Sequence, residues 1–589
     1  MLVIKRNGKK EEFSSDKIEI AILKAFEAEK MFLSDKDRKH ISDFIACLEE
    51  RESEEMPVEQ IQDMVEKFLC KRWFRVGKAY MLYRENHKKA RLIKDKLQYI
   101  HKYIDSQESA TNLSNTDDNA NTNQKNASTL EGELYKDLSR LVQRSQMKDL
   151  LTEIGSPYKD QYIKDLEHHI IYQHDESCPI LKPYCSAYTL YPLLVDGTTN
   201  VDGSKNHAPR HLSSFCGQFQ NLVFLLSAQK KGAGAYGEFF NFFSYFCEKE
   251  WGENYWQKAD LVVTNEYNKE QKTIGSIIDQ YFQSVTHYIN QPAGNRSYQS
   301  PFTNFNVFDN YYWHTMFDDF YFPDGTQPHW NAVNWLQKRY MRWLNEERTK
   351  TLLTFPVITV CCLTDDNDVL DKEYKDFITT QWAEGDSFFV YLSKNADSIS
   401  SCCRLRNEVS DNTFSSTTGL TGVQTGSCNV MTLNLNRITQ DWYRMMDRLN
   451  KDWNKQRAMD SYPDLHEYLQ NILNRVYDYQ KAYKTGLYNM DKQGMFPQTK
   501  AGYINLDKLY CTIGVNGINE AARFLGFTVS NNKDYMKFVV SILSTINNYN
   551  KEHSNSKKFK YNLELVPAES LGVKNYNWDK TDGLEPMSI

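Results

Sequence analysis

The sequence lacks three features that would place it in familiar classes of protein. Its 12 cysteines include no Cys-x-x-C pair, so neither a zinc ribbon nor a disulfide-stapled fold is indicated. It has no run of the ~18–20 apolar residues that a membrane-spanning helix needs, and its start has no signal-peptide core. A net charge of −6 gives no global reason to bind nucleic acid or an anionic membrane. We therefore expect a cytoplasmic protein with neither nucleic acid nor a membrane as partner.

Apolar residues are also scarce in one internal stretch, which divides the chain. Residues 105–129 consist largely of Asn, Ser, Thr, Asp and Gln, and such a stretch cannot bury enough surface to fold. The whole chain has 589 residues, of which 13% are aromatic, and this composition indicates packed structure elsewhere. We predict a first domain over 1–104, a flexible linker over 105–129 and a large second domain over 130–589.

The first domain opens with a cluster of positive charge. Residues 3–22 read VIKRNGKKEEFSSDKIEIAI, in which Asn7-Gly8 suits a tight hairpin and Ser14 or Ser15 can cap the following helix. A basic hairpin that leads into a helix N-terminus can seat a polyphosphate, because cations and unpaired amides point the same way. The alternative is an ordinary solvated hairpin. Farther on, 57–103 reads as one long helix.

The second domain alternates short apolar runs with longer helical segments. The runs are rich in β-branched and aromatic residues and lie at 354–364, 388–393, 430–435 and 510–515. Helical periodicity is found at 212–232 and 464–486. Apolar strands that alternate with helices are typical of a parallel sheet covered on both faces. The sequence thus predicts an α/β sheet or barrel.

The motifs near the N-terminus resemble the ATP-cone, a nucleotide-sensing module. Val-x-Lys-Arg-x-Gly, a Lys-Ile pair at Lys17, and AYMLYRE near residue 80 occur in that module's order. The resemblance implies a pocket for ATP or dATP, in which Lys5, Arg6 and Lys17 neutralise the triphosphate. Glu11 would lie near the sugar or base. The residues that match the pocket are Val3, Lys5, Arg6, Glu11, Ser14 and Lys17.

Six segments of the second domain together resemble the anaerobic (class III) ribonucleoside-triphosphate reductases, which are glycyl radical enzymes. They are HHIIYQHDESCPILKPYCSAYTLYPLLVDG (168–197), LSAQKKGAGAYGEF (226–239), SCCRLRNE (401–408), TGSCNVMTLNLNRI (425–438), IGVNGINEAARFLG (513–526) and VPAES (566–570). The resemblance implies a ten-stranded α/β barrel preceded by a small, mainly helical ATP-cone. It also implies reduction of ribonucleoside triphosphates to deoxyribonucleoside triphosphates, switched on by ATP and off by dATP.

Removal of a ribose hydroxyl by this chemistry starts with a sulfur radical held dry beside the sugar. Cys185 matches the family's thiyl-radical cysteine; Cys178 is the competing candidate, and a packed structural cysteine is the other alternative. Cys403 matches the second cysteine, which assists loss of the 2′-hydroxyl, although Cys402 is one residue away. Asn434 matches the asparagine that hydrogen-bonds the ribose hydroxyls, the alternative being an Asn on an exposed strand edge.

The resemblance extends to substrate phosphate, reductant and partners. The segment Pro567-Ala568-Glu569-Ser570 resembles the substrate-phosphate loop, and retention of Cys403 favours formate as the reductant. A radical glycine and a structural zinc site are expected after Ile589, and no metal ligands are predicted within the sequence itself. Expected partners are a radical-SAM activating enzyme with an iron–sulfur cluster and further copies of the chain, in a homodimer or larger oligomer controlled by dATP.

Three other interpretations compete with the reductase. The first is a non-catalytic nucleotide-sensing protein, in which an ATP-cone controls an inert barrel. The second is a glycyl radical enzyme of the pyruvate formate-lyase type, which has no need of an ATP-cone. The third is an oxygen-dependent reductase, which would carry an Asn-x-Cys-x-Glu stretch that this sequence lacks.

Overall fold

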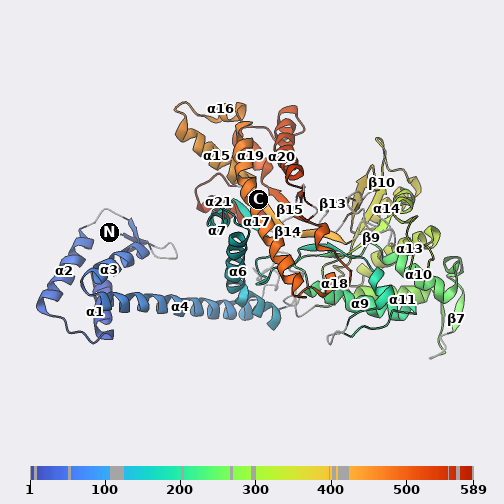
Figure 1. Ribbon diagram of the computed structural model, residues 1–589, viewed down its shortest axis with the longest axis horizontal. Coiled ribbons are helices and arrows are strands. Elements are labelled where there is room, and N and C mark those ends of the chain that lie inside the picture. The colour runs from blue at the N-terminus through green and yellow to red at the C-terminus, as the bar shows by residue number, and fades with distance from the viewer. Residues whose placement is uncertain are drawn as a thin grey trace. The chain divides into compact units, whose positions relative to one another are not determined.

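The computed structural model describes most of the chain and separates it into two units (Figure 1). The units span Met1–Gln107 and Glu108–Ile589. The described residues are 2–4, 10–50, 55–106, 125–199, 204–264, 269–292, 300–396, 398–400, 406–408, 424–554, 556, 558–565 and 571–586. For 87–92, 133, 137, 398–400 and 406–408 the description is limited to the backbone.

The described part of the first unit combines a small sheet with four helices. Strand β1 (Leu2–Ile4) pairs antiparallel with β2 (Lys10–Glu12) and parallel with β3 (Glu55–Pro57). The helices are α1 (Ser15–Ala28), α2 (Asp35–Glu49), α3 (Val58–Arg72) and α4 (Phe74–Asp105). They enclose an apolar core that includes Ile22, Phe26, Ile41, Leu69 and Val76.

The prediction of one helix over 57–103 is wrong. The chain leaves helical geometry at Trp73 (φ −133°, ψ 77°), where α3 ends and α4 begins. The Trp73 ring packs edge-on against Phe26 and Phe68, at centroid distances of 5.1 and 5.8 Å. Packing of this large side chain in the core therefore prevails over the helical periodicity of the sequence.

Nine strands of the described residues form the main sheet of the second unit. They are β4 (Ile171–Gln173), β5 (Cys185–Ala187), β6 (Gly234–Ala235), β9 (Thr303–Phe308), β10 (Val357–Leu363), β11 (Phe388–Ser393), β14 (Thr425–Asn434), β15 (Leu509–Asn516) and β16 (Lys560–Glu564). One parallel set runs β11-β10-β9-β6-β5 and another runs β14-β15-β16. The sets meet where β5 pairs antiparallel with β14, which β4 also joins antiparallel.

Helices and smaller elements complete the second unit. The helices are α6 (Ala127–Glu153), α7 (Gln161–Glu167), α8 (Tyr191–Asp196), α9 (Leu212–Ala228), α10 (Phe239–Trp251), α11 (Ile274–Ile289), α12 (Asn310–Phe317), α13 (Trp330–Arg348), α14 (Lys372–Ala383), α15 (Leu435–Leu449), α16 (Lys455–Asp460), α17 (Asp464–Lys492), α18 (Pro497–Lys500), α19 (Ile518–Leu525), α20 (Lys533–His553) and α21 (Leu571–Thr581). Short 3₁₀ turns, η1 (Tyr255–Lys258) and η4 (Leu506–Lys508), and two hairpins accompany them: β7 (Val262–Thr264) with β8 (Gln271–Thr273), and β12 (Ser398–Ser400) with β13 (Arg406–Glu408).

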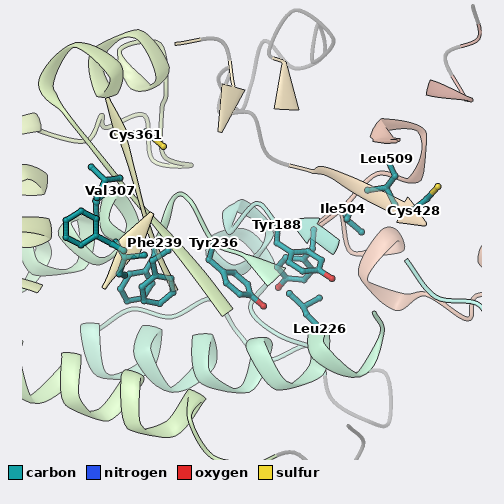
Figure 2. Close-up of a cluster of buried hydrophobic side chains, with 14 of the residues drawn as sticks. Tyr188, Leu226, Tyr236, Phe239, Val307, Cys361, Cys428, Ile504 and Leu509 are labelled. Atoms are coloured by element: carbon teal, nitrogen blue, oxygen red, sulfur yellow. The ribbon is translucent and has the colours of Figure 1, made fainter. Parts of the chain in front are cut away.

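The core lies between the sheet and the helices that cover it. Every residue of β9 and of β14 is buried, including their polar side chains, because helices and neighbouring segments cover both faces of the sheet there. Figure 2 shows Tyr188 and Tyr236 near Leu226 of α9, and the two tyrosine rings stack at 5.7 Å. No helix in the described part of the chain combines the length and the apolar character needed to cross a membrane.

The predicted α/β class is confirmed. The run at 388–393 is β11, and the runs at 354–364, 430–435 and 510–515 fall on β10, β14 and β15. The resemblance implied ten strands, whereas the described residues place nine in the sheet. The two parallel sets of strands position the candidate active site, which lies where β5 of one set pairs with β14 of the other.

Candidate active site around Cys185

Cys185 lies where the two parallel sets of strands meet. It is the first residue of β5, is 1% exposed, and is the register partner of Ser427 on β14. The Ala233 amide donates a hydrogen bond to its Sγ at 3.3 Å. A Cβ atom on Gly232 would lie 2.7 Å from this sulfur, so the position requires glycine. The backbone thus holds the thiol in a tight, dry setting.

Glu564, the last residue of β16, is a carboxyl group close to this thiol. Its side chain is buried, and neither carboxyl oxygen has a hydrogen-bond partner among the described residues. Burial raises its pKa well above the usual range, and the charge of the nearby Cys185 raises that pKa further. The shift favours the neutral acid, a form of Glu564 that can donate a proton to a ligand.

Asn434 ends β14 and has one paired and one unpaired polar atom. Its Oδ1 accepts a hydrogen bond from the Arg437 amide at 3.1 Å and caps α15. Its Nδ2 is buried, and no described residue supplies it with a hydrogen-bond partner. Asn434 is 3% exposed, so the alternative of an Asn on an exposed strand edge is wrong. The amide has two donors available for a ligand.

Strand alternation and register put these groups on one face of the sheet. Thr432, Gly514 and Glu564 form a row across β14, β15 and β16, and Asn434 shares the face of Thr432. Cys185 packs with Val430, which alternation places on that same face. We call the face of the sheet that carries Cys185, Thr432, Asn434 and Glu564 the inner face.

Two more polar side chains lie on the inner face. Asn562, two residues before Glu564, buries an Oδ1 atom that has no hydrogen-bond partner in the described part of the chain. His174 follows β4, and its Nε2 lies 2.8 Å from the hydroxyl of Thr432. The inner face therefore combines a thiol, a neutral carboxyl, amide groups and an imidazole, a set suited to binding a polyhydroxylated ligand beside sulfur.

The structure also brings together predicted nucleotide-site residues in the first unit. Val3 and Glu11 are register partners in β1 and β2, and Lys17 Nζ lies 3.6 Å from Glu11 Oε2. Ser14 is the N-cap residue of α1, but its side chain makes no capping hydrogen bond. The first-turn amides of α1 therefore lack the acceptor that a capping serine would supply.

Several predicted site residues lie outside the described residues: Lys5, Arg6, Cys403 and the loop Pro567-Ala568-Glu569-Ser570. Cys178, the competing thiol, is described, and it is only half buried. Within the described ranges, no group of three or more His, Cys, Asp and Glu side chains is placed to hold a metal ion.

Sequence reasoning missed Glu564, Asn562 and His174. The signal for Glu564 was available, because KYNLE is a short strand whose acidic residue comes just before the predicted phosphate loop. Nothing in the sequence showed that the carboxyl group would lie near Cys185, since that depends on the successive pairing of four distant segments.

Two parallel half-sheets with a buried cysteine at their junction are the architecture of a ribonucleotide reductase-type α/β enzyme. The chain belongs to the anaerobic ribonucleoside-triphosphate reductase family, whose model matches residues 118–584, and it is an oxidoreductase. An ATP cone domain matches residues 1–89. The alternative of a non-catalytic sensor is thereby excluded. No curated protein matches the chain.

Solved structures agree with this assignment. The anaerobic ribonucleotide reductase from Thermotoga maritima with citrate in its active site is 25% identical, with a TM-score of 0.65 over 77% of this chain and 78% of that one. The same enzyme in complex with dATP and CTP is 26% identical, with a TM-score of 0.64 over 77% and 71%. Another anaerobic ribonucleotide reductase is 25% identical, with a TM-score of 0.67 over 83% and 71%.

Proposed function

We propose that this protein reduces ribonucleoside triphosphates to deoxyribonucleoside triphosphates in an anaerobic cytoplasm, with Cys185 as the thiyl residue. The observation that carries the proposal is that Cys185 shares the inner face with Glu564 and Asn434. Both carboxyl oxygens of Glu564 and the amide nitrogen of Asn434 are buried without a hydrogen-bond partner among the described residues. Buried polar groups are usually paired, so unpaired ones gathered beside a buried thiol support a ligand site at that place. A ribose can pair with both, because its hydroxyl groups donate and accept.

Each residue has a role in this proposal. The Cys185 thiyl radical takes the 3′ hydrogen atom of the ribose, while Asn434 holds a ribose oxygen through its Nδ2 donors. The neutral Glu564 supplies a proton to the departing hydroxyl group. Cys403 is the second cysteine, and Pro567, Ala568, Glu569 and Ser570 bind the triphosphate.

Formate is the proposed reductant. Formate, the ribonucleotide and one proton give the deoxyribonucleotide, carbon dioxide and water, which balances atoms and electrons. A neutral Glu564 supports this choice, because an ionised carboxylate beside Cys185 would repel a second anion. The radical that oxidises Cys185 is expected from a glycine after Ile589, generated by a radical-SAM activating enzyme. A structural zinc site is expected in that same later segment.

ATP and dATP are the proposed regulators at the ATP-cone. The Glu11–Lys17 pair and the α1 N-terminus, which lacks a Ser14 capping bond, support an anion site there. ATP would favour the active state and dATP the inactive one, through their different affinities for two arrangements of the same oligomer.

The reaction is tested by anaerobic assay of the full-length, radical-charged enzyme with formate or a dithiol as the sole reductant. We expect turnover with formate, no activity in Cys185→Ser, and near-normal activity in Cys178→Ser, which tests the competing thiol. Cys403→Ser should lose formate-dependent turnover. Turnover with the dithiol alone would refute the proposal that formate is the reductant. An active Cys185→Ser enzyme would refute the assignment of Cys185 as the thiyl residue.

The regulatory site is tested by calorimetry of dATP binding. Changing Lys5 and Arg6 together to Ala removes two charge-assisted phosphate contacts, so affinity should fall by roughly tenfold or more. Lys36→Ala, an exposed cation on α2, is the matched control and should leave binding unchanged. Equal dATP affinity in all three proteins would remove the assignment.

A further inference from the structure

A second pair of cysteines lies on the opposite, outer face of β14 and β15, and the proposed reaction does not use it. Cys428 and Cys511 are both fully buried, and their Sγ atoms are 3.4 Å apart. Figure 2 shows Cys428 beside Leu509, in the core next to the start of β15. The two thiols come from positions 83 residues apart in the chain, so only the fold brings them into contact.

A β-bulge sets this contact. The register shifts between Ser427 and Asn429, so that Cys428 is the extra residue on β14 and faces Cys511 together with Asn429. Ser427 is the register partner of Cys185 and lies on the inner face. The bulge therefore directs Cys428 to the outer face and keeps its sulfur away from the site around Cys185.

A buried lysine completes the cluster. Lys484 of α17 is fully buried, and its Nζ donates to the carbonyl oxygen of Leu509. Although burial raises the pKa of Cys511, the hydrogen bond from Cys428 and the charge of Lys484 bring that pKa below its ordinary value. Burial and the same hydrogen bond raise the pKa of Cys428 well above its own. These shifts favour Cys511 as the thiol of the pair that ionises and Cys428 as the one that keeps its proton.

We propose that Cys428 and Cys511 form a reversible disulfide when the enzyme meets a hydroperoxide. The Cys511 thiolate attacks one peroxide oxygen, the O–O bond breaks, and Cys511 sulfenic acid and hydroxide form. The Cys428 thiol then attacks the sulfenic sulfur, forming the S–S bond, and the displaced hydroxide leaves. The first hydroxide takes up the proton that Cys511 released when it ionised, and the second takes up the Cys428 thiol proton. In total, two thiols and hydrogen peroxide give one disulfide and two waters, with two electrons passing from sulfur to peroxide.

The geometry allows this step with a small movement. A disulfide has an S–S distance of about 2.05 Å, so the sulfur atoms must approach by a little more than an ångström from their present 3.4 Å. Because Cys428 is the bulged residue, it is the part of β14 that can move without breaking the ladder on either side.

The experiment treats the anaerobically purified full-length protein with hydrogen peroxide, then denatures and alkylates it for peptide mass mapping. We expect a linked pair of peptides containing Cys428 and Cys511, lighter by two hydrogen atoms, which a dithiol converts back to two free thiols. Cys216, which is also buried but has a pKa that burial alone raises, is the internal control and should react more slowly by roughly tenfold or more.

Variants sharpen the assignment. In Cys428→Ala the cross-link should vanish and Cys511 should instead be trapped as a sulfenic acid by dimedone. Lys484→Met should slow formation of the cross-link, since the thiolate loses its nearby cation. Recovery of Cys428 and Cys511 as free thiols at the same rate as Cys216, or a link from either to a different cysteine, would overturn the proposal. The wild-type map decides it even if a variant folds poorly.

Discussion

The two faces of β14 bury asparagine side chains to the same degree but pair them differently. On the outer face, the Asn429 amide donates to Gln173 and to Gln480, both at 3.1 Å, and accepts from Gln173 at 2.6 Å. On the inner face, Asn434 keeps an unpaired amide nitrogen, and nearby Glu564 keeps an unpaired carboxyl group. Asn429 is 0% exposed and Asn434 is 3% exposed, so burial alone does not distinguish them.

The difference lies in what completes each set of hydrogen bonds. The outer network is closed by the protein itself, and Gln480 extends it to the Thr512 carbonyl oxygen at 2.8 Å. Such a network stabilises the fold, whereas each unpaired buried group costs about 1–3 kcal/mol until something binds it. Hydrogen-bond completeness therefore separates a structural face of the strand from a ligand-binding one. Substitutions on the inner face should lower activity with little loss of stability. Substitutions on the outer face should lower stability and leave activity unchanged.

The largest effect is expected on the inner face, at Asn434. Asn434→Ser keeps an oxygen that can cap α15 but removes the amide donors, so activity should fall about 100-fold with little loss of stability. Asn434→Ala should lose both the capping oxygen and the amide donors, with the same fall in activity and an added destabilisation of about 1 kcal/mol. Anaerobic turnover and denaturant unfolding measure the two effects. A fully active Asn434→Ser protein would mean that the amide does not contact substrate.

On the outer face, Gln480→Met should show the reverse pattern. The substitution conserves size but leaves the Asn429 amide and the Thr512 carbonyl one partner short, which should lower the free energy of unfolding by about 2 kcal/mol. Turnover per folded molecule should not change. Tryptophan fluorescence reports on the second unit, because Trp73 is the only one of the 11 tryptophans in the first. An unchanged unfolding midpoint would show that the outer network contributes no stability.

The sequence was most informative where the chain follows local rules. The run 388–393 coincides with β11, and the apolar segment at 212–232 contains α9, because periodicity and composition act within a few residues. It was misleading at 57–103, where the packing of Trp73 interrupts a helical pattern. Cys185 and Asn434 were found through motif order, and the structure places both on the inner face.

The remaining parts of the site depend on long-range pairing, which no local pattern encodes. Glu564 approaches Cys185 only because β16 pairs with β15, β15 with β14, and β14 with β5. The contact between Cys428 and Cys511 depends in addition on one bulge in β14. A carboxyl group and a cysteine are ordinary residues in sequence, and their neighbours in space are what make them chemically distinctive.

The smallest effect concerns the charge state of Glu564, on the inner face, and it appears as a dependence of protein stability on pH. Its native pKa lies well above that of an unfolded glutamate, so between these two values the native state holds a proton that the unfolded state has released. Raising the pH through this window therefore destabilises the wild-type protein, by at most about 1.4 kcal/mol per pH unit. Glu564→Gln carries no such proton, so its stability relative to wild type should rise by at most about 1.4 kcal/mol between about pH 5 and pH 6. Denaturant titrations across this range provide the measurement, with Glu467→Gln, an exposed glutamate on α17, as the control that should track the wild type. If the Glu564→Gln and wild-type curves ran parallel, Glu564 would be ionised in the native state, and its proposed role as a proton donor would fail.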